Sequence, residues 1–170
     1  MKTRSAGFYL FWFLFICAFI HMFYYYPLLP DKVASHFNAT GEADNWSSRE
    51  FFIGFYIMIT LVMTVTFAGF GYIGPKLPES LINLPNKPYW LAPERKEKTF
   101  AFISDSLFQL GAVTLLLLIS MMHLTFRANM DKSNNIGVLP WVFIGCFLIF
   151  TAVWLVQLYR KFLKIPCRMN

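Results

Sequence analysis

Four apolar stretches, each about 20 residues or longer, constrain this chain more than any other feature; they run over residues 6–26, 51–73, 100–124 and 138–159. About 20 helical residues cross the roughly 30 Å hydrocarbon core of a bilayer. Lipid offers the backbone no hydrogen-bond partners, so such a stretch must be a helix. The short connections favour antiparallel neighbours. The sequence therefore predicts an all-α membrane protein: one membrane domain over residues 1–170, an up-down bundle of four transmembrane helices.

The composition supports a membrane protein and argues against a nucleic-acid-binding, disulfide-rich or zinc-binding protein. Apolar residues make up 57% of the chain, whereas charged residues make up 14% and gather in a few blocks. The formal charge of +6 does not indicate nucleic acid, because the bases flank apolar stretches and no nucleic-acid-binding motif is present. Three cysteines form neither a disulfide framework nor a zinc-site spacing. No hydrolase, zinc-protease, phosphate-loop or kinase motif occurs.

Basic residues predict the orientation. Lys2 and Arg4 precede the first stretch as they would a signal peptide, but the stretch is too long and lacks a small-residue cleavage pattern, which favours a retained anchor. Eleven Lys and Arg residues fall in the N-terminus, the segment 74–99 and the tail, against four in the other two connections. The positive-inside rule then places both termini and an inner loop 74–99 in the cytoplasm, and an outer loop 27–50 outside.

The outer loop has the composition of a folded segment. Pro27 and Pro30 end the first helix, and residues 31–36 are predicted to form one helical turn. Residues 38–41 read as a turn in which Gly41 supplies the unusual backbone angles. Ser47 and Ser48 are candidate caps for the second helix.

We expect this loop to be a compact cap on the helix ends and a recognition surface on the outer face. Val33, Phe37 and Trp46 would pack onto the helices, while Glu42, Asp44 or loop carbonyls would hold the His36 ring. The candidate recognition residues are His36, Phe37, Gly41, Glu42, Asp44 and Trp46.

Two motifs carry a resemblance to a known family. The outer loop reads LPDKVASHFNATGEADNW, and the inner loop reads NLPNKPYWLAPER. The first resembles the Leu-Pro, His-Phe, Gly, Asp, Trp pattern of a bacterial membrane domain of unknown function, which forms the N-terminal part of the SdpI-type toxin-immunity proteins. The second is similar to a stretch of its stand-alone relatives. The resemblance implies a multi-pass protein of the bacterial cytoplasmic membrane. The longer immunity proteins continue with further spans, so immunity carries over weakly.

Polar residues near or within the spans are the remaining candidates for chemistry. His21, His36 and His123 are weak metal-ligand candidates, all in the outer half; hydrogen-bonded structural histidines, a small-ligand site and proton-linked switching are the alternatives. Asp105 is the carboxylate well inside a span, with Gln109 four residues on and therefore on the same face. Snorkelling bases, Arg95, Lys96 or Lys98, could pair with this acid. A polar cavity open to the cytoplasm is the competing interpretation.

The inner loop and the glycines of the second span complete the predictions. Small residues let helices approach closely. We expect Gly54, Gly69, Gly71 and Gly74 to lie at such helix–helix contacts. The alternative for the last three is that they only fray the end of the helix. The inner loop is expected to lie along the membrane surface, where its bases either set the orientation or contact lipid headgroups. Its candidate residues are Asn86, Lys87, Tyr89, Trp90 and Arg95.

The leading functional prediction is a non-enzymatic sensor, immunity-like protein or accessory subunit that binds another membrane protein or a peptide. The alternative is a membrane enzyme or transporter that uses the outer histidine and acids or Asp105. The lipid bilayer is the predicted surrounding, and no cofactor or nucleic acid is expected. The partner and the oligomeric state are not specified by the sequence.

Overall fold

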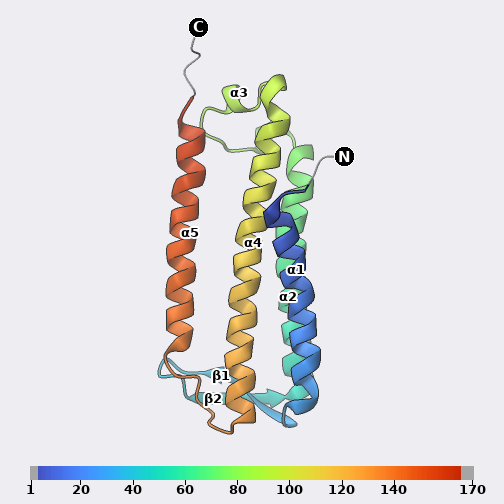
Figure 1. Cartoon of the computed structure of the whole chain (residues 1–170), viewed down its shortest axis with the longest axis vertical. Coiled ribbons are helices and arrows are strands. Elements are labelled where there is room, and N and C mark those ends of the chain that lie inside the picture. The colour runs from blue at the N-terminus through green and yellow to red at the C-terminus, as the bar shows by residue number, and fades with distance from the viewer. Residues whose placement is uncertain (1–3, 166–170) are drawn as a thin grey trace.

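The computed structural model describes residues 4–165 and is mostly helical (Figure 1). Four helices, with the short turns that extend the first two, are long and apolar enough to cross a membrane. In chain order the elements are α1 (Ala6–Tyr25), η1 (Tyr26–Leu28), β1 (Lys32–Phe37), β2 (Ala43–Ser48), α2 (Arg49–Ile73), η2 (Gly74–Lys76), η3 (Glu79–Leu81), α3 (Lys87–Trp90), α4 (Pro93–Met130) and α5 (Leu139–Leu163).

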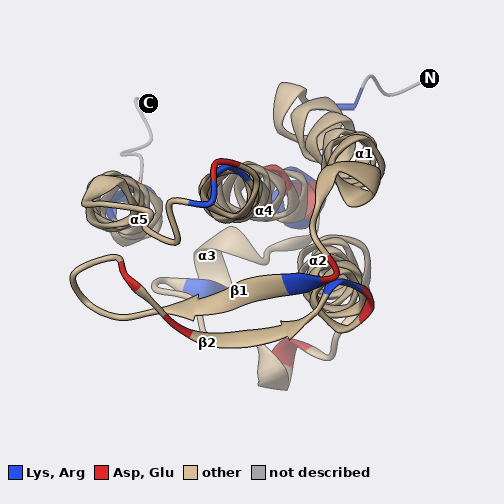
Figure 2. Ribbon diagram, turned by 90° about the horizontal axis from the view of Figure 1, so that it is seen from below, with Lys and Arg blue, Asp and Glu red and all other residues tan. Residues whose placement is uncertain are grey.

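Helix α4 is the centre of the helical layer. It packs against α1, α2 and α5, and α1 also contacts α2. Figure 2 shows α5 on one side of α4 and α1 and α2 on the other. Helix α1 begins and α5 ends toward one end of the molecule, here called the termini end, whereas β1 and β2 lie at the opposite, hairpin end (Figure 1). Two buried aromatic clusters, around Phe126 and around Phe108, join α1, α2 and α4.

The helix boundaries follow local capping chemistry. Ser5 Oγ accepts a hydrogen bond from Phe8 N–H at the start of α1, and Ser48 Oγ accepts one from Phe51 N–H at the start of α2, as the sequence predicted for the second helix. Helix α4 begins at Pro93, because proline suits the first helical turn. It therefore takes up the end of the predicted inner loop and extends past the predicted span 100–124 at both ends.

The predicted helical turn over residues 31–36 is wrong, and the protein is not purely α-helical. Strands β1 and β2 pair antiparallel, with Ala34 opposite Trp46. Six residues are too few for a stable isolated helix, and the β-branched and aromatic side chains of β1 favour a strand. The predicted turn 38–41 does connect the strands: Gly41 N–H donates to the Asn38 carbonyl at 3.0 Å, and Gly41 has a φ of +86°.

The hairpin lies across the helix ends and is anchored through β1. Val33 and Ala34 are fully buried, and Phe37 is half-buried. The expected packing of Trp46 is wrong, because 43% of its surface is exposed. The reason is visible in Figure 2, where β1 lies between β2 and helix α4, so that β2 is farther from the helix.

Most of the glycines predicted to bring helices close together do not lie at a helix–helix contact. Around Gly54, Gly69 and Gly74 an added Cβ would meet nothing within 4 Å, whereas Gly71 lies against the Phe108 ring. The tightest approaches are elsewhere. A Cβ on Gly7 of α1 would lie 2.7 Å from Asp105 Oδ1 of α4, and a Cβ on Gly111 of α4 would lie 2.8 Å from Phe11 of α1.

Candidate functional site

A single buried side chain ties the hairpin to α4. Asn129 Oδ1 accepts a hydrogen bond from Ala34 N–H at 2.7 Å, and Asn129 Nδ2 donates to the Ala34 carbonyl at 3.1 Å and to the Thr125 carbonyl at 2.8 Å. The side-chain amide thus pairs with both backbone groups of Ala34, as a neighbouring strand would. The sequence interpretation missed Asn129, although a polar residue near the end of a long apolar helix was the available signal.

The connection between α4 and α5 holds the tip of the hairpin. Ala43 N–H donates to the Asn134 carbonyl at 2.8 Å, and Ile136 N–H donates to the Gly41 carbonyl at 2.9 Å. Trp141 Nε1 of α5 donates to the Ala39 carbonyl at 3.0 Å. Gly41 lies so close to Gly137 that a side chain would not fit, since an added Cβ would be 2.6 Å from the Gly137 carbonyl oxygen. Glu42 forms a backbone bridge with Asn135.

The polar residues of the hairpin face outward on this fixed scaffold. His36 Nδ1 lies 2.5 Å from Asp44 Oδ1, so the carboxylate orients the imidazole, as the sequence suggested. The His36 side chain is 68% exposed and that of Asp44 is 44% exposed. Together with the exposed Trp46, they give the hairpin an aromatic and ionisable outer surface.

The other two histidines form a separate pair between α1 and α4. His21 Nε2 lies 3.4 Å from His123 Nδ1, and the His21 ring stacks on Phe126 with 5.2 Å between ring centroids. Within residues 4–165, no three His, Cys, Asp or Glu side chains are placed to hold a metal ion together. The three histidines proposed as metal ligands therefore do not form one site. His21 Nδ1 and the Tyr56 hydroxyl are both buried with no hydrogen-bond partner in this structure.

Asp105 meets a polar partner rather than a base. Gln109 Nε2 donates to Asp105 Oδ2 at 3.0 Å, which agrees with their predicted common face, whereas Oδ1 is buried beside Gly7 without a hydrogen bond. Two of the three bases expected to reach this acid are engaged elsewhere. Arg95 pairs with Glu94 at 3.2 Å, and Lys96 pairs with Glu79 at 2.8 Å. The Asp105 carboxylate instead faces the first turn of α1, where helix amides favour negative charge.

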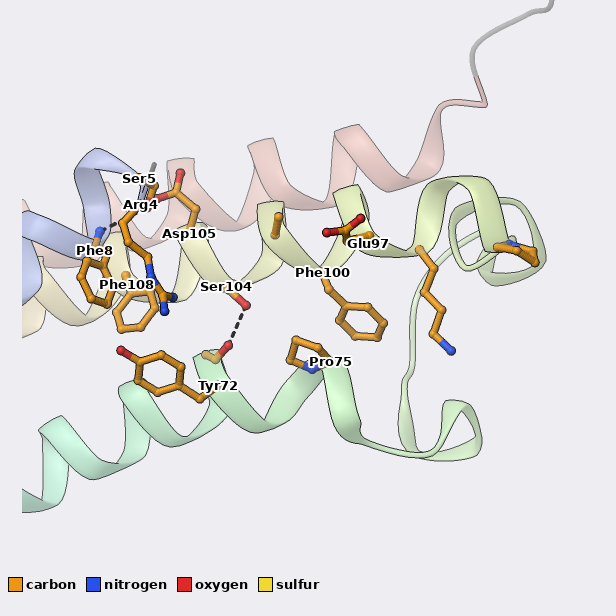
Figure 3. A pocket seen from close by; sticks show the side chains of 14 residues that line it. Arg4, Ser5, Phe8, Tyr72, Pro75, Glu97, Phe100, Ser104, Asp105 and Phe108 are labelled. Atoms are coloured by element: carbon orange, nitrogen blue, oxygen red, sulfur yellow. Dashed lines mark hydrogen bonds between the residues drawn. The ribbon is translucent and has the colours of Figure 1, made fainter. Parts of the chain in front are cut away.

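A pocket of about 770 Å³ opens next to Asp105 at the termini end (Figure 3). Helix α1 begins level with Asp105, so the part of α4 before this residue lacks α1 as a neighbour. The Arg4 guanidinium lies over the Phe8 ring, 4.9 Å from its centroid, and 5.6 Å from that of Tyr72. The lining residues are Arg4, Ser5, Phe8, Gly71, Tyr72, Pro75, Pro93, Lys96, Glu97, Phe100, Ala101, Ser104, Asp105 and Phe108.

The inner-loop motif ties helix ends together. Asn86 Nδ2 donates to the Phe162 and Leu163 carbonyls at 3.0 Å each, and Trp90 Nε1 donates to the Phe162 carbonyl at 2.9 Å, so both side chains cap the end of α5. The Arg95 guanidinium stacks over the Tyr89 ring at 4.1 Å. Lys87 is the first residue of α3.

An ion pair joins this loop to α4. The hydrogen bond from Lys96, together with its positive charge, lowers the pKa of the Glu79 carboxyl. The inner loop is therefore a structured connection between α2, α4 and α5. Two of the bases proposed to contact lipid headgroups, Arg95 and Lys96, already have carboxylate partners.

Residues 13–61 match the family model of a domain of unknown function, DUF1648. The match covers most of α1, the whole hairpin and the first half of α2, so the outer-loop motif lies inside it and the inner-loop motif lies outside. No curated protein matches the chain, and no solved structure matches it. The family description assigns no activity, and the link to SdpI-type immunity proteins gains no support from these comparisons.

Proposed function

We propose that this chain is a four-span protein of the bacterial cytoplasmic membrane, an up-down helix bundle with both termini in the cytoplasm. The four apolar helices support the spans. Helix α1 begins and α5 ends at one end of the molecule, with the base-rich inner loop, whereas the hairpin end has four of the fifteen Lys and Arg residues (Figure 1). That asymmetry favours the cytoplasm for the termini end.

Within that architecture, the protein recognises a partner rather than transforming a substrate. It acts as a sensor, immunity-like protein or accessory subunit that binds another membrane protein or a peptide at the hairpin. The observation that carries this proposal is the contrast within the hairpin: Val33 and Ala34 are fully buried and tied to Asn129, whereas Trp46 and His36 are exposed. A rigid scaffold that presents an exposed tryptophan is typical of a binding surface.

Accessibility labelling tests the orientation. In a variant without natural cysteines, Ala39→Cys in the hairpin turn should react with a membrane-impermeant thiol reagent in intact cells. Ser80→Cys in the inner loop should react only after permeabilisation. Both positions are exposed. The opposite pattern would reject this topology.

Site-specific photo-crosslinking tests the recognition surface. A photoreactive residue in place of Trp46 should yield a discrete crosslinked product in native membranes, and His36→Ala should abolish it by removing the side chain that Asp44 orients. The same photoreactive residue at Lys132, an exposed position at the hairpin end, is the matched control. Equal crosslinking from both positions, or an unchanged product after His36→Ala, would show that the hairpin has no specific partner.

A transporter or enzyme remains the second candidate, because the pocket beside Asp105 is a cavity within the helical layer. This function requires solvent to reach Asp105 from the termini end. Asp105→Cys should then react with a small polar thiol reagent at a rate comparable to that of Ser80→Cys. Protection of Asp105→Cys from the reagent would reject this candidate.

A further inference from the structure

We propose that the pocket at the termini end binds an anionic phospholipid, with its phosphate held by Arg4 and its acyl chains against the aromatic wall. This site is distinct from the hairpin and does not depend on a partner there. It rests on the proposed membrane location of the chain.

The electrostatic part of the site is Arg4. Within residues 4–165, no ion pair joins Arg4 to a carboxylate, and the described contacts of its guanidinium are with the Phe8 and Tyr72 rings. Figure 3 shows the Arg4 side chain extending from the start of α1 toward the Tyr72 ring of α2. A guanidinium held on aromatic faces keeps its donors available for a phosphate, which it binds in a bidentate, charge-assisted manner.

Two acids, Glu97 and Asp105, line the pocket beside the two bases Arg4 and Lys96, but Asp105 does not turn its charge into it. One Asp105 oxygen accepts from Gln109, and the other is buried beside Gly7. Figure 3 shows this carboxylate next to Ser5, at the start of α1. A cationic ligand would need a free carboxylate there and would also meet Arg4. Lys96, although paired with Glu79, adds a second cation to the lining.

The apolar part of the site suits acyl chains. The accessible apolar lining consists of the exposed Tyr72, Pro75 and Pro93 and the half-buried Phe8, whose ring packs edge-on against Phe108 with 5.2 Å between centroids. The volume of about 770 Å³ lies in the range of pockets that hold compact organic ligands. The pocket lies where α1 begins, which is the level of the membrane–water boundary in the proposed topology. Basic pockets between transmembrane helices on the cytoplasmic side commonly bind anionic headgroups.

Lipid binding to the purified full-length protein tests the proposal. Protein in neutral detergent is titrated with phosphatidylglycerol or with phosphatidylcholine of the same chain composition, and binding is followed by native mass spectrometry. Phosphatidylglycerol should bind about tenfold more tightly, and Arg4→Gln should remove most of this preference, since one charge-assisted contact is worth about a factor of ten. Lys164→Gln, an exposed base after α5 and outside the pocket lining, is the matched control and should change affinity less than about twofold.

Each other outcome rejects the proposal in a recognisable way. Equal affinity for the two lipids, or equal losses of phosphatidylglycerol affinity in Arg4→Gln and Lys164→Gln, would show that this pocket does not bind an anion specifically. Tighter binding of phosphatidylcholine than of phosphatidylglycerol, lost in Asp105→Asn and retained in Arg4→Gln, would indicate a site for the cationic choline group. Displacement of the lipid by inorganic phosphate alone would indicate a soluble anion. Detergent removes the influence of orientation, so a wrong topology would not alter these results.

Discussion

Replacing Asn129 with leucine should release the hairpin from the helices. The side chains are similar in size, but leucine can neither accept from Ala34 N–H nor donate to the Ala34 carbonyl, which Asn129 contacts at 2.7 and 3.1 Å. Ala34 is 0% exposed, so water does not replace these bonds without local opening. Each unpaired buried backbone group costs about 1–3 kcal/mol. Two such groups cost about 2–6 kcal/mol, and about 1.5 kcal/mol of added apolar burial offsets part of this, which predicts a net loss of about 0.5–4.5 kcal/mol.

Two measurements check this prediction on the same variant. Reversible unfolding in mixed micelles gives the change in free energy, and hydrogen exchange of residues 32–37 shows whether β1 opens locally. Arg127→Leu, two positions earlier on α4, is the control, because its ion pair with Asp131 is exposed and should contribute less than about 1 kcal/mol. If Asn129→Leu unfolds like Arg127→Leu and β1 exchanges no faster, the amide pairing does not hold the hairpin.

Two further predictions compare matched substitutions. Gly7→Ala should destabilise the protein by about 1–3 kcal/mol, because its Cβ would lie 2.7 Å from Asp105 Oδ1. The control is Gly54→Ala, whose added Cβ would meet nothing within 4 Å; this change should be neutral or stabilise the protein by up to about 1 kcal/mol through helix propensity. If both substitutions shift thermal unfolding equally, α1 and α4 do not approach closely at Gly7. Val33→Ala should cost about 2 kcal/mol and speed exchange in β1, whereas Trp46→Ala should leave stability within about 1 kcal/mol and act on partner binding. Faster exchange of the whole hairpin in Trp46→Ala would show that Trp46 anchors it after all.

The four long helices were predictable because a long apolar stretch has few alternatives to a helix. A run of about 20 apolar residues without internal polar partners must satisfy its backbone within a helix, so the four helices follow from the sequence. The serine cap of α2, the turn ending at Gly41 and the shared face of Asp105 and Gln109 also follow, because each depends on residues within four positions of one another. The sequence offered Glu42, Asp44 or loop carbonyls as partners of His36, and the structure pairs His36 with Asp44.

Contacts between distant residues decided the rest. Residues 32–37 form a strand because residues 43–48 are available to pair with them and because Asn129, 95 positions from Ala34, bonds the other edge of this strand. Tertiary packing also left Trp46 exposed on β2. The close helix approaches expected at Gly54 occur instead at Gly7 and Gly111. The side chains of Asn86 and Trp90 bond the end of α5. The sequence determined which segments form helices long and apolar enough to cross a membrane, since hydropathy is a property of each segment by itself. The tertiary structure decided which side chains face one another, since that depends on how the helices are rotated and where each begins.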